Sequence, residues 1–398
     1  MKICFVVQRY GLEVNGGAEA YAREVAEHMV SIGGHEVDCA TTCAIDYQTW
    51  KNEYEEGTTE LNGVKIHRFK NISERNPEEF NKLCGKILGN SKATKEQEED
   101  WMRKQGPESP ALVNWLEAHH DDYDVFIVVC YLYYSTYFGL PKIADKAIFI
   151  PTAHEEVPIH LKIFKDMFEL PAAFYYNTVE ELELTNDLFP ETYFKPDNLG
   201  KGGVGVEVPE NVDPEGFKKK YGLDDNFVLY IGRIDENKCC PELFKYFVEY
   251  KDRHPGSNLK LVLMGKEMIE VPKRDDIISL GFVSEEDKFS GIAASKFFIL
   301  PSKFESLSIV VLESMAMEKP VLVSGECPVL KGHCVRSNAG LYYSGYYEFE
   351  GCVDYLLNNP DVVKKMGVNG KKYIDDNYRW TEIVKGYENL IDQLLEEE

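Results

Sequence analysis

The chain has 398 residues, more than one hydrophobic core of ordinary size accommodates, so two domains are expected. Its formal net charge of -24 is distributed over both halves and argues against a nucleic-acid partner, because binding phosphates requires a concentrated basic surface. Apolar residues make up 44% of the sequence, which is enough for a chain that folds throughout.

Ten cysteines occur without regular spacing, and several lie inside apolar runs, as is typical of buried thiols in a reducing compartment. We expect no disulfide, and the adjacent pair Cys239–Cys240 lacks the spacing of a zinc site. The apolar N-terminal run is too short for a signal peptide, and no later run reaches transmembrane length. The sequence therefore predicts a cytoplasmic protein with no metal bound at these cysteines, and its charge does not indicate membrane association.

Short apolar runs alternate with helical patterns in the first half, which indicates βαβ units and a parallel sheet. A helix is expected over Ala18–Ile32, where apolar residues recur at helical spacing before two glycines. Residues 71–110 are polar and are expected to form an inserted helical or loop segment. The predicted strands of this half are Ile3–Val7, Glu36–Thr41, Asp124–Cys130 and Ala147–Ile150.

The second half repeats this alternation, with a helix expected over Pro241–Tyr250. Four glycines within Asn198–Gly205 predict a hinge between the halves. Tyr378–Leu395 carries a continuous apolar stripe and must pack against another part of the protein. We predict an α/β protein with domains at 1–197 and 198–377 and a closing helix within 378–398. The predicted strands of this half are Val228–Ile231, Lys260–Met264, Ile277–Leu280, Phe297–Leu300 and Val321–Val323.

The strongest local pattern places two carboxylates, Glu305 and Glu313, on either side of a turn and the first turns of a helix. The turn follows the strand Phe297–Leu300, and a helix N-terminus presents amide groups and a positive dipole end to phosphate oxygens. The carboxylates would accept hydrogen bonds from hydroxyls beside that phosphate. The simpler alternative is a solvated Glu305 and a first-turn Glu313 that the helix dipole favours.

A second pattern follows the strand Val228–Ile231, where Gly232 and Arg233 are followed five residues later by Lys238. At the carboxyl end of a parallel strand, such a loop can neutralise a diphosphate, with arginine binding it in a bidentate manner. The alternative is a solvated loop in which the arginine pairs with Asp235 or Glu236.

Two other motifs carry less weight. Asp122 and Asp124 fit the D-x-D pattern of metal-dependent transferases, but they precede a strand and so lie at its amino end, away from the expected site. The dinucleotide fingerprint G-x-G-x-x-G is absent after the first strand, which argues against an NAD enzyme.

Together these elements resemble the GT-B retaining glycosyltransferases of family 4, over essentially the whole chain. The most specific part is Glu305–Glu313 with the segment Ala316–Val321 behind it, and the glycine turn Asn15–Glu19 is a weaker part. The resemblance implies two Rossmann-like domains whose parallel sheets face each other across a central cleft. The first domain would be the acceptor side, the second would bind a nucleotide sugar, and the last helix would cross back to the first.

The resemblance also implies roles for individual residues. Arg233 and Lys238 would bind the donor diphosphate and stabilise the leaving phosphate without a metal. Glu313 would hold the ribose hydroxyls, and Glu305 the hydroxyls of the transferred sugar. His154, which follows a first-domain strand beside Glu155 and Glu156, would contact the sugar. Backbone contacts to sugar and diphosphate would come from Gly16, Gly17, Ala18, Gly232, Ser306, Leu307, Ser308 and Ile309.

Two positions depart from the pattern of that family. Cys239 follows Lys238 where a glycine is common, so this loop could be tighter or differently directed. Ser306–Ser308 stands where the turn is often rich in glycine; serines can keep the amide contacts, so this departure bears on donor identity more than on activity.

The implied reaction transfers a hexose-type sugar from a nucleoside diphosphate sugar to an acceptor hydroxyl with retained anomeric configuration, in glycan, polysaccharide or glycolipid synthesis. One alternative is a sugar-nucleotide epimerase of the same architecture, which would need acid/base carboxylates on both faces of the sugar. The other is a non-catalytic binding subunit, against which the presence of Arg233, Lys238, Glu305 and Glu313 argues.

Overall fold

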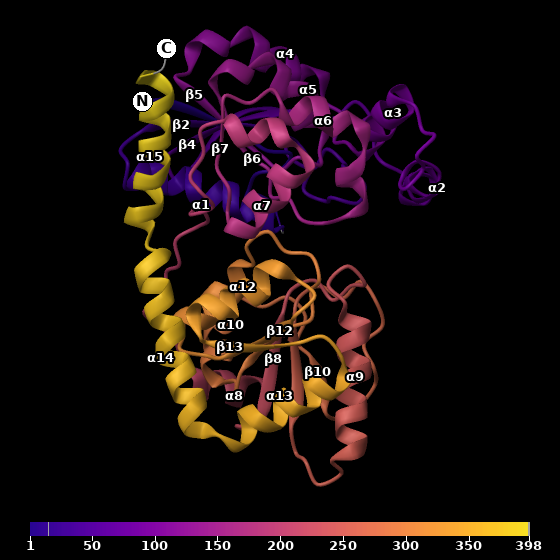
Figure 1. The fold of residues 1–398 in the computed structure, drawn as a ribbon, viewed down its shortest axis with the longest axis vertical. Coiled ribbons are helices and arrows are strands. Elements are labelled where there is room, and N and C mark those ends of the chain that lie inside the picture. Colours follow the sequence, from indigo (N-terminus) through magenta and orange to yellow (C-terminus); the bar gives the residue numbers. More distant parts are fainter. Residues whose placement is uncertain (15, 397–398) are drawn as a thin grey trace. The chain divides into compact units, whose positions relative to one another are not determined.

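The computed structural model describes residues 1–14 and 16–396 and divides them into two compact units (Figure 1). Unit 1 comprises Met1–Val204 together with the C-terminal helix, and unit 2 comprises Gly205–Arg379. Within the described residues, no helix is both long enough and apolar enough to cross a membrane.

Unit 1 is built on a sheet with the strand order β3-β4-β2-β1-β5-β6-β7. Every pairing is parallel except that of β3 with β4, which is a hairpin at one edge. The central strands β1, β5 and β6 are almost wholly buried, as expected of parallel strands that helices cover on both faces. The strands are β1 Lys2–Val6, β2 Glu36–Thr42, β3 Gly57–Leu61, β4 Val64–Phe69, β5 Val125–Val129, β6 Ala147–Ile150 and β7 Ala173–Phe174.

The helices of unit 1 include two in the segment that the sequence predicted as an insertion, α2 and α3. Thr94 caps α3 with a reciprocal bond to Gln97, and Asn76 caps α2. The helices are α1 Gly17–Ser31, α2 Pro77–Ile87, α3 Lys95–Gln105, α4 Pro110–Ala118, α5 Tyr134–Gly139, α6 Lys162–Phe168, α7 Val179–Leu188 and α15 Trp380–Glu396.

Helix α15 packs against α1 in unit 1, although the two lie at opposite ends of the sequence (Figure 1). Tyr387 is fully buried, stacks on Tyr175 with ring centroids 3.8 Å apart, and is hydrogen-bonded to Tyr21. Trp380 stacks on His28 at 3.6 Å. The apolar stripe of this helix is therefore covered by unit 1.

Unit 2 is a fully parallel sheet with the strand order β10-β9-β8-β11-β12-β13. Helices α9 and α14 lie on opposite sides of it in the view of Figure 1. The strands are β8 Phe227–Ile231, β9 Lys260–Met264, β10 Ile277–Ser279, β11 Phe298–Leu300, β12 Val321–Ser324 and β13 Gly340–Tyr343. The helices are α8 Pro214–Tyr221, α9 Cys240–Arg253, α10 Glu285–Ala294, α11 Ile309–Ala316, α12 Pro328–Ser337, α13 Tyr346–Asn358 and α14 Pro360–Asn377.

The glycine-rich segment that was predicted as a hinge is in part fixed to unit 1. Asn198 donates to the carbonyl oxygen of Tyr176 and accepts from its amide, both at 2.8 Å, and the Gly202 amide donates to the same carbonyl at 2.9 Å. The division between the units lies after Val204, seven residues beyond the boundary predicted at residue 197.

Candidate functional site

The loop that leaves β8 approaches the loop that leaves β9 closely. The Gly232 amide donates to the carbonyl oxygen of Met264 at 2.9 Å, and a Cβ on Gly265 would lie only 1.9 Å from the Gly232 carbonyl oxygen. Both glycines have positive φ, 150° and 143°, which residues with a side chain rarely adopt. The glycines therefore fix where the chain turns into the segment that carries Arg233 and Lys238.

Asp235 organises that segment. Its Oδ1 accepts the backbone amide of Lys238 at 2.8 Å, and its Oδ2 lies 3.4 Å from Nε of Arg233. Asp235 is only 7% exposed, whereas the Arg233 side chain is 36% exposed. The pairing that the sequence offered as the simpler alternative is thus present, and it orients Arg233 while leaving its side chain accessible to solvent.

Lys238 contacts Glu305, which belongs to the other predicted motif. Its Nζ donates to Oε1 of Glu305 at 2.6 Å, across 67 residues of sequence. Glu305 therefore has a charged partner, contrary to the simpler alternative of a solvated carboxylate. The loops after β8 and β11 meet at the carboxyl ends of their strands, as expected for neighbouring strands of a parallel sheet.

Helix α11 begins in this same place, after Ser306 and Leu307. Ser308 is its N-cap with a left-handed backbone, φ 67°, so its side chain does not cap the helix. Its Oγ is buried and has no hydrogen-bond partner among the described residues. From Ile309 on, the first amides of the helix precede its internal hydrogen bonds and are available to an anion.

Glu313 lies one turn into α11 and is only 8% exposed. Its Oε1 accepts from Nζ of Lys288, on α10, at 2.7 Å. Burial raises the pKa of the Glu313 carboxyl, and the Lys288 ammonium opposes that rise. Its Oε2 is buried without a hydrogen-bond partner among the described residues, so one acceptor of this carboxyl group is open. No sequence motif pointed to Lys288.

His333 holds the turn that precedes α11. Its Nε2 donates to the carbonyl oxygen of Leu307 at 2.9 Å, and its Nδ1 lies 3.2 Å from the hydroxyl of Tyr373. Burial lowers the pKa of His333 to about 4, and the charge of Arg336 adds to this effect. The ring is therefore neutral at pH 7 and holds the turn through a single tautomer.

In unit 1, the loop after β6 carries His154. Its Nδ1 lies 3.6 Å from Oε1 of Glu156, and Glu156 also accepts a hydrogen bond from the hydroxyl of Tyr131 at 2.5 Å. Glu155 is more exposed and contacts His160 at 2.5 Å. Glu156 thus lies close to His154 and is hydrogen-bonded to Tyr131.

This loop is anchored by a carboxyl group that the sequence analysis did not single out. Glu181, on α7, is 1% exposed, and its two oxygens accept the backbone amides of Ala153 at 2.6 Å and Asn177 at 2.7 Å. Burial raises the pKa of Glu181 to about 8, against the lowering effect of these amides.

The glycine turn of unit 1 has a packing reason that the sequence did not indicate. A Cβ on Gly16 would lie 2.1 Å from Oε2 of Glu19, and Glu19 is held by Arg9 and Gln8, each at 2.8 Å. A Cβ on Gly17 would meet nothing within 4 Å, so packing does not require a glycine there. Gly17 and Ala18 open helix α1, and Asn15 lies outside the described residues.

Asp122 and Asp124 lie at the amino end of β5, as predicted. Asp124 accepts the backbone amide of Lys2 at 2.6 Å, and Asp122 ends a short 3-10 turn. Neither residue reaches the carboxyl edge of the sheet, where β1 and β6 deliver Gly16 and His154. All ten cysteines are free thiols.

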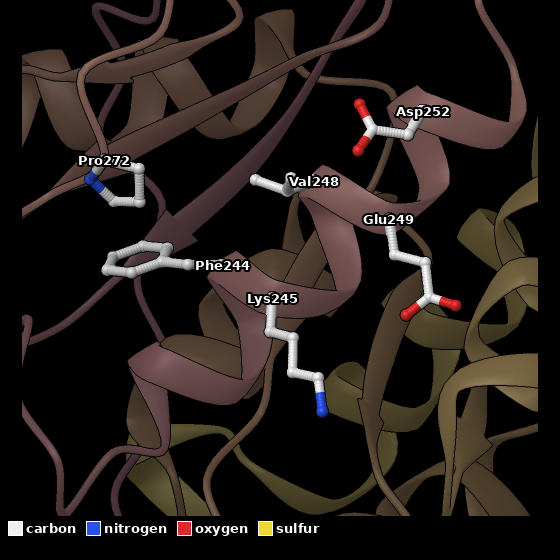
Figure 2. Close-up of a pocket in the computed structure, with 6 residues that line it drawn as sticks. All are labelled: Phe244, Lys245, Val248, Glu249, Asp252 and Pro272. Carbon is white, nitrogen blue, oxygen red and sulfur yellow. The ribbon is translucent and has the colours of Figure 1, made fainter.

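A surface hollow in unit 2 lies between helix α9 and Pro272 (Figure 2). Phe244 and Val248 face Pro272 across it, and Lys245 and Glu249 extend from the same helix (Figure 2). None of the predicted site residues lines this hollow.

Comparison with known proteins agrees with this geometry. Residues 213–373 match the family described as "Glycosyl transferases group 1", a range that includes Arg233, Lys238, Glu305 and Glu313. Over nearly its full length the chain is similar to an uncharacterized glycosyltransferase of Methanocaldococcus jannaschii, with 24% identity over 412 residues, 98% of this chain and 97% of that protein.

Solved structures of other proteins are similar to this chain over its whole length. Sucrose-phosphate synthase from Thermosynechococcus elongatus gives a TM-score of 0.72 at 16% identity and covers 100% of both chains. Anabaena HepE in complex with UDP-glucose gives a TM-score of 0.68 at 13% identity, again over 100% of both chains.

The two parallel-sheet units and their similarity to these structures show that the chain has the GT-B fold, which confirms the fold class predicted from the sequence. Within unit 2, residues 213–373 are similar to the group 1 glycosyltransferases. The narrower assignment to family 4 stays a prediction.

Proposed function

We propose that this chain is a retaining, metal-independent glycosyltransferase that moves a hexose-type sugar from a nucleoside diphosphate sugar to an acceptor hydroxyl. The observation that carries the proposal is the meeting of Lys238, Glu305 and the N-terminus of α11 at one edge of the sheet in unit 2. HepE, a structure similar to this one, is in complex with UDP-glucose.

The cations of unit 2 would stabilise the charge that develops on the leaving diphosphate. Arg233 can bind two phosphate oxygens at once, and Lys238 supplies a second positive charge. Both cations now face carboxylates, so a bound donor would exchange part of these contacts for contacts to phosphate. Their partners remain close by, which keeps each cation oriented in the absence of ligand.

The carboxylates would bind the hydroxyl groups of the donor. Glu305, freed from Lys238, would accept from hydroxyls of the transferred sugar, and Glu313 would accept from the ribose through its open Oε2. The buried Oγ of Ser308 and the first amides of α11 would complete the contacts to sugar and phosphate.

Unit 1 would contribute the acceptor side. We propose that His154, held by Glu156 and by the Ala153–Glu181 bond, contacts the transferred sugar, and that Gly17 and Ala18 leave room for it. Retention would follow from attack of the acceptor hydroxyl on the same face of the sugar that the diphosphate leaves. The leaving phosphate would take the acceptor proton. The product would be a glycan, polysaccharide or glycolipid.

The experiment is a thermal-shift screen of the full chain against nucleoside diphosphates and their sugars, which names the donor without requiring the acceptor. A selective stabilisation by one base supports the proposal, because a ligand that binds only the folded state stabilises it. Stabilisation by none of them would refute it.

Independence from metal is tested once a donor and an acceptor are known. Activity should persist in excess chelator, because Arg233, Lys238 and α11 supply the positive charge that a metal would otherwise bring. Loss of activity that manganese restores would overturn this part of the proposal, and would make Asp122 and Asp124 candidate ligands again. The anomeric configuration of the product, read by NMR, tests retention.

A further inference from the structure

Lys288 pairs with Glu313 and, unlike Glu313, has no role in the function proposed so far. Lys288 Nζ donates to Oε1 of Glu313 at 2.7 Å, while Oε2 of Glu313 is buried and open among the described residues. The carboxyl group is therefore bound on one oxygen by a cation from a different helix. Its second oxygen remains available for a ligand.

Lys288 is itself well covered, with a side chain only 14% exposed. Its other charged partner is Glu285, at 2.6 Å, whose own side chain is 77% exposed. Burial disfavours the Lys288 ammonium, but Glu313 and Glu285 together hold its pKa above the usual value. Lys288 is therefore charged at neutral pH, and Lys288 and Glu285 are the charged groups that act on Glu313.

Removing the lysine would leave Glu313 as an uncompensated buried charge. Such a group takes up a proton rather than remain ionised in a site of low polarity. A protonated carboxyl is a weaker acceptor, and its proton competes for one of the two oxygens. The ability of Glu313 to accept from a sugar hydroxyl thus depends on a residue 25 positions earlier in the sequence.

We propose that Lys288 is a positioning residue for the nucleotide: it keeps Glu313 ionised and oriented, so that Oε2 accepts a ribose hydroxyl, without contacting the ligand itself. This inference rests on the proposed function, because it assumes a nucleoside diphosphate at Glu313. Lys288 would then contribute to donor affinity from α10, outside the motifs in the loops after β8 and β11.

The experiment measures the affinity of UDP, ADP and GDP by isothermal titration calorimetry between about pH 7 and 9, where the terminal phosphate, with a pKa near 6, no longer titrates. The proteins are the wild type, Lys288→Met, Lys288→Arg, Glu313→Gln and the double variant Lys288→Met/Glu313→Gln. Lys245→Met, an exposed lysine of the same unit, is the matched control. Circular dichroism establishes that each variant is folded.

For the nucleotide that the wild type binds, Lys288→Met should weaken affinity about 10- to 100-fold at pH 7, the range for a lost hydrogen bond to a charged group. Its affinity should then rise with pH, by up to about tenfold per unit, as Glu313 ionises. The affinity of the wild type should stay nearly constant, Lys288→Arg should be close to it, and Lys245→Met should have no effect. In the Glu313→Gln background, Lys288→Met should change little further.

Two results would overturn the inference, and each has a different meaning. Unchanged affinity in Lys288→Met at every pH would make the pair purely structural. A loss that persists undiminished in the Glu313→Gln background would mean that Lys288 contacts the nucleotide directly. If Lys288→Met does not fold, Lys288→Gln is measured against the same criteria. If the wild type binds none of the three and the thermal-shift screen selects no other nucleoside diphosphate, the proposed function is refuted instead.

Discussion

Cys239 and Ser308 take left-handed backbone conformations, with φ of 56° and 67°, at the starts of the two helices that follow the site loops. These are the positions where the sequence departs from the glycines of the family it resembles. Glycine adopts this conformation without steric cost, whereas other residues do so at about 1–2 kcal/mol. Cys239 and Ser308 therefore each adopt a backbone conformation that a glycine would take more readily.

Arg233 is the residue whose loss should affect the reaction most directly. Arg233→Ala should lower the transfer rate at least ~100-fold, the scale for removing one group that stabilises charge in a transition state. Steady-state kinetics with the identified donor measure this. Arg253→Ala, on the surface of α9 and paired with Glu350, is the control that should leave the rate unchanged. Near-normal turnover in Arg233→Ala would remove this residue from the mechanism.

His333 should make the stability of the protein depend on pH. Its pKa is about 4 in the folded state and about 6.5 in an unfolded chain, so the unfolded state binds the extra proton between these values. The contribution of His333 to stability is complete above about pH 6.5 and is lost as pH falls towards 4. Calorimetric unfolding should show that the free energy of unfolding falls more steeply with decreasing pH over this window for the wild type than for His333→Gln. An equal decline in the two proteins would contradict the lowered pKa of His333.

At the scale of elements, the sequence was most informative where strands are buried. The predicted bounds of β6 and β9 agree with the structure, β8 differs by one residue at one end, and β1 and β5 differ by one residue at each end. The hairpin strand β3 was not predicted, because its side chains are largely exposed and show no apolar pattern. Strand β7 has only two residues, too short for any periodic signal.

Only the parts of the candidate site that are close together in sequence could be predicted. Motifs close in sequence, such as Arg233 with Lys238, could be recognised from their spacing after a strand. The contacts of Lys288 with Glu313 and of His333 with Leu307 join residues about 25 positions apart on different elements. No local pattern encodes such pairs, since they arise only when the strands are ordered in the sheet.

The contact between the loops after β8 and β9 should be intolerant of a side chain. Gly265→Ala should lower the free energy of unfolding by more than about 1 kcal/mol, because it combines a positive φ with a clash against the Gly232 carbonyl. Gly351→Ala, in helix α13 with open space around it, should instead stabilise by about 0.5–1 kcal/mol. Thermal unfolding followed by circular dichroism compares the two. Equal effects would show that the close approach is absent.

At the scale of the whole molecule, the chain passes between its units twice, after Val204 and after Arg379. The segments that follow and precede these points are bonded to each other within unit 2, where the amide of Val206 donates to the carbonyl oxygen of Tyr378 at 2.9 Å. The C-terminal helix then completes the core of unit 1. The stability of the N-terminal unit therefore depends on the last residues of the sequence.

Tyr387→Ala tests that dependence, and the tryptophans provide a selective probe, because all four lie in unit 1. The substitution removes a fully buried ring and should cost about 3–5 kcal/mol, as for other large buried aromatic residues. Denaturant unfolding followed by tryptophan fluorescence should show the loss. Gln393→Ala, exposed on the same helix, should change it by less than about 0.5 kcal/mol. If Tyr387→Ala also lowers the free energy of unfolding by less than about 0.5 kcal/mol, the ring of Tyr387 does not contribute to the core of unit 1 as described.

The most direct test of the central claim is a crystal structure of the protein with the nucleoside diphosphate that the thermal-shift screen selects. We predict that Arg233 and Lys238 bind the pyrophosphate at the N-terminus of α11, and that Oε2 of Glu313 accepts from the ribose. A nucleotide bound elsewhere, or one that leaves the Lys238–Glu305 and Arg233–Asp235 pairs undisturbed and out of reach of its phosphates, would contradict it.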